Sequence, residues 1–255
     1  MGAAVQRRTC AAIISSMSRR GKFITFEGLD GTGKSTQLRK LAAALRAAGH
    51  KVFETREPGG TATGEKIRRV LLDSATQGLS PLAEMALMFA SRAQHIAEVI
   101  QPALERGQIV LCDRFTDSTE AYQGYGRKLG SEDVLELHRV LCGGLQPDLT
   151  ILLDSDPAMS VGRARQRNQR ASHAATKIAN HSLKNKHADE NRFEQQNRAF
   201  FTRVHAGYQA IAARDAQRVV AVDARGTPAQ THRRIMEVLQ QKLRLGPSRQ
   251  EFIWS

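Results

Sequence analysis

The stretch FEGLDGTGKST, residues 26–36, decides the fold class of this chain. Gly28 and Gly33 stand five positions apart, and Lys34 and Ser35 follow directly, which satisfies the pattern G-x-x-x-x-G-K-[ST]. A loop with so little side-chain bulk can turn its backbone N–H groups inward, and the following helix adds the positive end of its dipole. We therefore expect the loop to bind a nucleoside triphosphate with magnesium, Lys34 reaching the β- and γ-phosphates and Ser35 ligating Mg²⁺. The predicted nucleotide-binding residues of the loop are Gly28, Leu29, Asp30, Gly31, Thr32, Gly33, Lys34, Ser35 and Thr36.

Short apolar runs alternate with helical patterns around this loop. The run KFITFEG ends at a glycine and predicts a strand buried on both faces. Strands that alternate with helices form a parallel sheet with helices on both faces. The sequence therefore predicts a three-layer α/β fold of the P-loop NTPase type, with a five-stranded parallel sheet flanked by helices. The expected strands are 22–28, 51–56, 108–114, 148–154 and 218–224. The first expected helix runs from the loop to Gly49, and the others occupy 81–107, 156–168, 191–214 and 227–243. Pro102 is expected to kink or break the helix at 81–107.

The ends of the predicted strands are where chemistry is expected, because ligands of parallel sheets bind beyond the carboxyl ends of the strands. Beside Gly28, these ends hold Arg56, the pair Asp113-Arg114, Asp154 and Asp223. Asp154 and Asp223 each precede a turn or helix, so we expect them to cap it.

The net charge of +13 is concentrated in two segments. Residues 1–22 and 163–187 contain basic residues and no acidic ones, while the rest of the chain is nearly neutral. This distribution does not indicate a nucleic-acid partner. No apolar run approaches the ~20 residues of a membrane helix, so no membrane association is expected. Three widely separated cysteines indicate a reducing compartment, and we expect a cytoplasmic protein.

The two ends of the chain are expected to lie outside the folded domain. Residues 1–21 bear Arg and Ser and no acid, which predicts a disordered leader, although a transit peptide has the same composition and Met17 could be the start. The domain is expected at 22–244, and the tail at 245–255 has no periodicity and is expected to be loose.

Four further stretches carry a family resemblance: TREPGGTATGEKIR (55–68), FASRAQH (89–95), CDRFTDSTEAYQGYGR (112–127) and GRARQRN…ENRFE (162–194). Together with the phosphate loop they closely resemble bacterial thymidylate kinases, from about residue 22 to residue 243. The resemblance implies transfer of the γ-phosphoryl group of ATP to dTMP, giving dTDP and ADP in dTTP synthesis, with Mg²⁺ as cofactor, small-molecule substrates and a homodimer.

The residue types agree with phosphoryl transfer to a phosphate. The second pKa of a phosphate monoester is near 6, so the acceptor is already anionic at neutral pH and needs no general base. The site must instead supply positive charge, because donor and acceptor repel each other and charge spreads in the transition state. Arginines at the strand ends and in the segment 162–194 fit that requirement.

The resemblance assigns residues to the acceptor phosphate and the metal. Asp30 resembles the carboxylate that reaches the 3′-hydroxyl and phosphate region of dTMP, and Arg114 resembles the clamp on its phosphate. Asp113 resembles the carboxylate linked to Mg²⁺, which Ser35 would also ligate. Arg56 could join the clamp, or the turn that follows it could have only a structural role.

The resemblance also assigns residues to the base and sugar. Phe89 resembles the aromatic residue that stacks on thymine and Arg92 the arginine that binds the base; a spacing of four, as in some relatives, would place Met88 there instead of Phe89. Thr119 and Gln123 resemble partners of the base edge, and Tyr122 resembles the ring that packs on the sugar and disfavours a 2′-hydroxyl. The predicted dTMP-binding residues are Asp30, Arg56, Phe89, Arg92, Arg114, Thr119, Tyr122 and Gln123.

The segment 162–194 resembles the lid of bacterial relatives, which carries arginines that the phosphate loop here lacks. Arg163 and Arg167 are an i,i+4 pair on one helix face, expected to close over ATP and neutralise the transferring group. Residues 168–190 lack apolar periodicity and are expected to form an extended mobile loop. The lid residues predicted to bind ATP are Arg163, Arg165, Arg167 and Arg192, and the predicted catalytic set is Lys34, Asp113, Arg114, Arg163 and Arg167.

Three alternatives remain at this stage. The first is a kinase for another nucleoside monophosphate. The second is a GTP-dependent switch, but residues 185–189 have the wrong spacing for the guanine-reading N-K-x-D motif. The third is a nucleic-acid binder that uses the two basic segments, which would show steeply salt-dependent binding.

Overall fold

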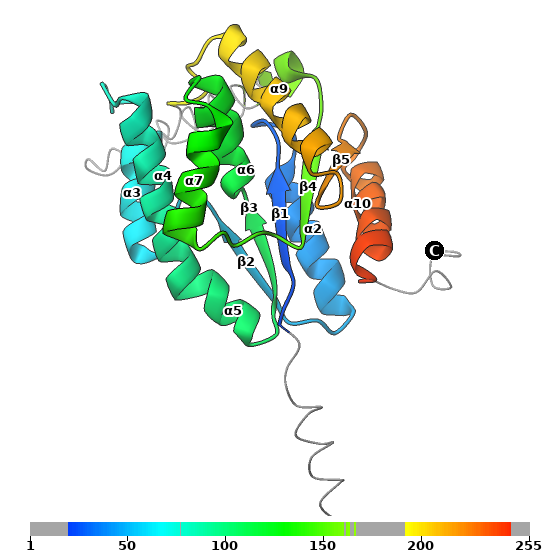
Figure 1. Ribbon diagram of the computed structural model, residues 1–255. Helices are drawn as coiled ribbons and strands as arrows, with labels where there is room; N and C mark the ends of the chain where they lie inside the picture. Colours follow the sequence, from blue (N-terminus) through cyan, green and yellow to red (C-terminus); the bar gives the residue numbers. More distant parts are fainter. Residues whose placement is uncertain (1–19, 77, 161, 164–165, 167–191, 246–255) are drawn as a thin grey trace, which may run out of the picture.

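The computed structural model describes residues 20–76, 78–160, 162–163, 166 and 192–245, and Figure 1 shows its arrangement. Five parallel strands form one sheet in the order β2-β3-β1-β4-β5. The predicted fold class is confirmed, and each strand lies within its predicted range. The strands are β1 Phe23–Glu27, β2 Val52–Arg56, β3 Ile109–Asp113, β4 Leu149–Asp154 and β5 Val219–Asp223.

Helices cover both faces of this sheet, and the side chains of β1 alternate between two apolar clusters, one on each face. Ile24 and Phe26 of β1 pack with Leu41 of α2 and Ile235 of α10 on one face. Phe23 points to the other face, where α5 packs against it. The helices on both sides are α2 Lys34–Ala47, α3 Ala62–Leu72, α4 Pro81–His95, α5 Gln101–Glu105, α6 Thr116–Thr119, α7 Ser131–Cys142, α9 Arg198–Arg214 and α10 Pro228–Leu243.

Two of the predicted helices differ from the structure in detail. The break expected at Pro102 occurs as a π-helical segment, η1 Ile96–Ile100, directly before the short helix α5. The helix expected from residue 191 begins only at Arg198, because the Asn197 side chain caps it by accepting a hydrogen bond from Phe200 N. A second π-helical segment, η2 Glu120–Gly126, continues α6.

Some predictions fall outside the described residues. The leader apart from residues 20–21, most of the lid and most of the tail lie there. In the part that is described, no helix is both long enough and apolar enough to cross a membrane.

Candidate active site

The phosphate loop connects the buried end of β1 to the start of α2, as the sequence predicts. Gly28 has φ +127°, and a Cβ atom there would lie 2.5 Å from the carbonyl oxygen of Leu153 in β4. Gly33, directly before α2, has φ +97°. Both positions therefore require glycine, the first because of the neighbouring strand and the second because of its backbone conformation.

Lys34 is buried at the centre of this loop. Its Nζ donates to the carbonyl oxygens of Gly28 and Leu29 at 3.0 and 2.9 Å, and lies 3.7 Å from Asp30 Oδ1. Burial lowers the pKa of Lys34, and the positive charge of Arg114 lowers it further. The loop thus holds the ammonium group with its own carbonyl groups in the position where a polyphosphate would need a cation.

Ser35 and Asp113, the two predicted metal ligands, are in direct contact although they are distant in sequence. The Ser35 hydroxyl donates to Asp113 Oδ2 at 2.7 Å. Among the described residues there is no group of three or more His, Cys, Asp or Glu side chains that could hold a metal by itself. A single hydroxyl and a single carboxylate fit Mg²⁺, which usually binds one or two protein ligands together with substrate phosphates and water.

Arg114 follows β3 in a left-handed conformation, with φ +72°. Its Nη2 donates to Asp30 Oδ1 at 2.6 Å, and its Nη1 donates to Ser118 Oγ at 3.0 Å and to Tyr208 OH at 3.2 Å. Burial alone would lower the pKa of Arg114, but the Asp30 carboxylate holds it well above its ordinary value. The guanidinium is therefore a fixed positive charge beside the phosphate loop.

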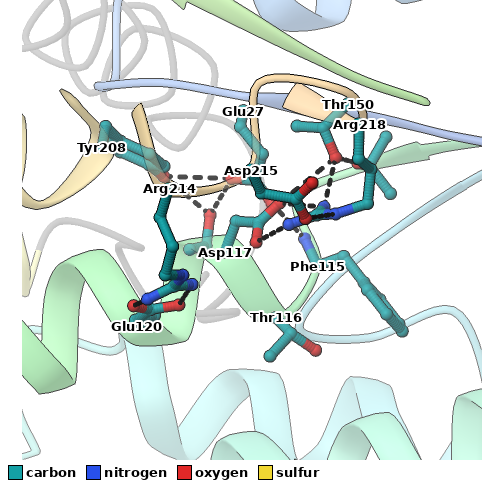
Figure 2. A network of polar contacts seen from close by, with 12 residues as sticks. Glu27, Phe115, Thr116, Asp117, Glu120, Thr150, Tyr208, Arg214, Asp215 and Arg218 are labelled. Carbon is teal, nitrogen blue, oxygen red and sulfur yellow. Dashed lines mark hydrogen bonds and ion pairs between the residues drawn. The ribbon is translucent and has the colours of Figure 1, made fainter. Parts of the chain in front are cut away.

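Glu27, the last residue of β1, is linked to this arginine through two hydroxyl groups, and Figure 2 shows its carboxylate beside Tyr208. Its carboxylate accepts hydrogen bonds from Phe115 N at 2.7 Å, from Ser118 Oγ and from Tyr208 OH at 3.0 Å. Two of the hydroxyls that accept from Arg114, those of Ser118 and Tyr208, therefore donate to Glu27. Burial, and then the negative charge of Asp117, raise the pKa of Glu27 from 4.5 to about 7.

Glu27→Gln is expected to remove a pH-dependent part of the stability. A carboxyl whose pKa is raised in the folded state keeps its proton between pH 4.5 and 7 while the unfolded chain loses it, so the free energy of unfolding falls as the pH rises through this window. The fall attributable to Glu27 is at most about 3 kcal/mol, at 1.36 kcal/mol per pKa unit. Urea unfolding of the wild type and the variant at pH 5 and pH 8 measures it.

The matched control for this measurement is Glu132→Gln, at an exposed position of α7. The free-energy difference between wild type and Glu27→Gln should shrink or reverse at pH 8, whereas the difference for the control should stay constant. An equal Glu27 difference at both pH values would contradict the prediction.

The residues predicted to contact the base gather on α4 and on α6 with η2. Arg92 Nε donates to Glu57 Oε2 at 2.7 Å and its Nη2 donates to Thr119 Oγ1 at 3.0 Å. Gln123 Nε2 donates to Glu84 Oε1 at 2.7 Å. The remaining polar atoms of this group, Arg92 Nη1 and Gln123 Oε1, are buried and have no hydrogen-bond partner in the described part of the chain. They offer one donor and one acceptor to a ligand.

Comparison with known proteins decides the family. The family model described as thymidylate kinase matches residues 26–235. The chain belongs to the thymidylate kinase family. The thymidylate kinase of Solidesulfovibrio magneticus is 48% identical over 206 residues, 81% of this chain and 92% of the relative. That of Trichlorobacter lovleyi is 47% identical over 221 residues, 87% of this chain and 98% of the relative. The crystal structure of thymidylate kinase from Ehrlichia chaffeensis matches with a TM-score of 0.65 at 31% identity, covering 87% of this chain and 99% of that one.

Phe89, for which the thymidylate kinase resemblance implied stacking on the base, lies in the core of this structure. Phe89 has no exposed surface and packs in the core with Met85, Val134 and Cys142. The Arg92 guanidinium lies 5.1 Å from the centre of its ring. Phe89 is as deeply buried as Arg92 and Gln123, and its predicted contact with the base stays a prediction. Met88, the other position considered, is partly buried against the cluster that contains Leu29 and Tyr122.

Arg192 differs from its predicted role as an ATP ligand in the thymidylate kinase lid. Its Nη2 donates to Glu84 Oε2 at 2.7 Å and its Nε donates to the carbonyl oxygen of Leu71. Because the guanidinium is buried against α3 and α4, its partners are structural. The sequence showed the arginine but could not show which way its side chain turns.

The other predicted arginines lie apart from the contacts of Arg114. Arg56, at the end of β2, is exposed and pairs with Glu65 of α3 at 3.1 Å. Arg163 is exposed and donates to the carbonyl oxygen of Met159 at 3.4 Å. Arg165 and Arg167 lie outside the described residues. Among the strand-end acids, Asp223 accepts from Arg225 N in a turn as expected, whereas Asp154 pairs with His205 of α9 at 2.9 Å and is not a cap.

Three buried residues of this thymidylate kinase site were missed at the sequence level. Glu27 was visible as the only charged side chain inside the apolar run 23–27, which is an unusual position for an acid. Tyr208 carried no such signal, because α9 reaches Glu27 only through the tertiary fold. Glu84 was an ordinary residue in the first turn of a predicted helix.

Proposed function

We propose how this chain carries out the reaction of its family, the transfer of the γ-phosphoryl group of ATP to dTMP, which gives dTDP and ADP in dTTP synthesis. The observation that most supports the assignment of residues is the pair of buried, unpartnered atoms Arg92 Nη1 and Gln123 Oε1. Thymine presents an acceptor at O4 next to a donor at N3–H, which complements this donor and acceptor.

The loop from Gly28 to Thr36 holds the phosphates of ATP by its backbone N–H groups. When a phosphate is bound, Lys34 Nζ exchanges the carbonyl groups of Gly28 and Leu29 for phosphate oxygens, because an anion attracts the ammonium more strongly than neutral carbonyl groups do. Lys34 thereby neutralises charge that grows on the transferring group.

Ser35 and Asp113 hold Mg²⁺ together with the phosphates of ATP. The contact between their side chains supports this role, since both oxygen atoms already converge on one point beside the loop. An ion held there would supply positive charge against the charge that develops on the phosphates of ATP.

Arg114 holds the phosphate of dTMP, and Asp30 orients the arginine and reaches the 3′-hydroxyl of the sugar. Support comes from the network around the guanidinium, in which Asp30, Ser118 and Tyr208 fix its plane. On binding, the guanidinium exchanges some of these partners for phosphate oxygens, with which it can form two parallel hydrogen bonds. No general base is required, because the acceptor oxygen is anionic near neutral pH.

The base and sugar are bound by residues of α4, α6 and η2. Arg92 donates to O4 of thymine, and Gln123 accepts from N3–H, with Thr119 holding the arginine. The Tyr122 ring packs on the sugar; its hydroxyl lies 3.3 Å from Arg114 Nη2, which supports a position next to the acceptor phosphate.

The remaining assignments rest on the family resemblance. Arg163 and Arg167 neutralise the transferring phosphoryl group. Near-normal turnover of the double variant Arg163→Ala,Arg167→Ala would contradict this role. The chain forms a homodimer. A molecular mass of 28.1 kDa in sedimentation equilibrium, which is the mass of one chain, would contradict this. A cytoplasmic location is in keeping with the free thiols of Cys112 and Cys142.

A coupled assay of ADP release with a panel of acceptors tests the proposed function. With ATP and Mg²⁺, dTMP is expected to react faster than dUMP, UMP, dCMP and dGMP. Cytosine opposes the Arg92 and Gln123 atoms, and guanine matches them but is a larger purine. Tyr122 disfavours the 2′-hydroxyl of UMP, and dUMP lacks the 5-methyl group of thymine. Omission of Mg²⁺ with added EDTA is expected to abolish turnover. Absence of dTDP, or a faster reaction with dCMP than with dTMP, would overturn the assignment.

A further inference from the structure

Glu84, in the first turn of α4, is a charged side chain with no exposed surface. Its Oε1 accepts from Gln123 Nε2 at 2.7 Å and from Arg127 Nε at 3.1 Å. Its Oε2 accepts from Arg127 Nη2 at 3.0 Å and from Arg192 Nη2 at 2.7 Å. Burial alone would raise the pKa of Glu84, but these hydrogen bonds and the two positive charges bring it below its ordinary value. Glu84 is therefore a buried, ionised acceptor.

The side-chain amide of Gln123 has only one favourable orientation beside this carboxylate. An ionised carboxylate accepts hydrogen bonds and cannot donate them, so the NH₂ group must face Glu84. The carbonyl oxygen Oε1 is thereby turned away from Glu84, into a buried position without a partner among the described residues. A buried acceptor without a partner costs about 1–3 kcal/mol, which is a cost that a site for a ligand can explain.

We propose that Glu84 is a specificity-determining positioning residue, which holds the Gln123 amide so that its carbonyl oxygen reads the N3 position of the acceptor base. This inference rests on the proposed contact between Gln123 and dTMP. Thymine and uracil carry an N–H donor at N3, whereas cytosine carries an acceptor there. If the amide were free to turn, its NH₂ group would suit cytosine and the discrimination would weaken.

Arg92 carries the rest of this discrimination. Its free Nη1 suits the O4 acceptor of thymine and opposes the amino group of cytosine. Arg92 is held by Glu57 and Thr119 and has no hydrogen bond to Glu84. Loss of Glu84 should therefore relax the preference for dTMP over dCMP without abolishing it.

The test is the ratio of kcat/KM for dTMP to kcat/KM for dCMP in Glu84→Gln. An amide at position 84 can donate or accept, so it no longer dictates the orientation of Gln123. The ratio is expected to fall at least tenfold, mainly through a higher KM for dTMP. Glu84→Asp keeps the negative charge beside the two arginines, but its shorter side chain lengthens the hydrogen bond from Gln123. This variant is also expected to lower the ratio, and it replaces Glu84→Gln if that variant does not fold.

The matched control is Arg127→Lys. It replaces the two guanidinium hydrogen bonds to the same carboxylate but keeps a positive charge beside Glu84 and the bond from Gln123, so Tm is expected to fall while the ratio is unchanged. If the Glu84 variants lower Tm and both activities together with an unchanged ratio, Glu84 is structural and the inference is overturned.

Gln123→Leu separates this inference from the proposed function. A ratio that falls in Gln123→Leu but not in either Glu84 variant removes the positioning role alone. A ratio unaffected by Gln123→Leu removes the proposed contact between Gln123 and the base, and the inference with it.

Discussion

Lys34→Met is expected to lower kcat between about a hundredfold and a thousandfold, the usual cost of removing one preorganised donor from a transition state. The ammonium lies inside the phosphate loop, where it is buried and held by two carbonyl groups. Methionine fills a similar volume but cannot neutralise the charge that spreads over the transferring phosphoryl group. Steady-state kinetics with saturating ATP and dTMP measures the effect.

The control for this substitution is Lys40→Met, at an exposed position of the same helix α2. It changes the net charge equally and is expected to leave kcat within about twofold, since exposed charges far from the reacting groups are screened by salt. A kcat for Lys34→Met within tenfold of the wild type would show that the loop backbone and other cations carry the charge without it.

Arg114→Ala is expected to lower kcat/KM for dTMP by about a hundredfold to ten-thousandfold, while the KM for ATP changes little. Hydrogen bonds to charged groups contribute about 1.5–3 kcal/mol each, and a guanidinium makes two to a phosphate. Arginine and alanine both carry a Cβ atom, so the left-handed backbone at position 114 strains both residues similarly. The change in kcat/KM therefore reports mainly the loss of the guanidinium side chain.

Two variants delimit this result. Arg114→Lys keeps the charge but cannot reach Asp30, Ser118 and Tyr208 together, and is expected to recover only part of the activity. Arg139→Ala, at an exposed arginine of α7 that pairs with Glu136 on the surface, is expected to leave kcat/KM unchanged. An equal rise of KM for ATP and for dTMP in Arg114→Ala would contradict a role confined to the acceptor.

The sequence determined the five strands and the phosphate loop because both depend on local chemistry, whereas the helices α3, α6 and α7 were not predicted. Short apolar runs favour strands that are buried on both faces, and Gly33 is required by its own backbone conformation. Gly28 also has a positive φ, and the neighbouring strand β4 adds a second reason for glycine there. The spacing of Lys34 and Ser35 from these glycines then places both side chains at the start of α2. Five strands and the phosphate loop were therefore predictable.

The tertiary structure decided which residues meet and which way their side chains point. The order β2-β3-β1-β4-β5 places β3 next to β1, which brings Asp113 to Ser35 and Arg114 to Asp30. Residue type and spacing did not reveal that Phe89 and Arg192 turn into the core, because helical periodicity gives a face and not the neighbour that covers it. The hydrogen bond from Tyr208 to Glu27 joins residues 181 positions apart, so no local pattern could reveal it. Burial and hydrogen bonding are properties of the assembled fold, whereas propensity and turn geometry are properties of a few consecutive residues.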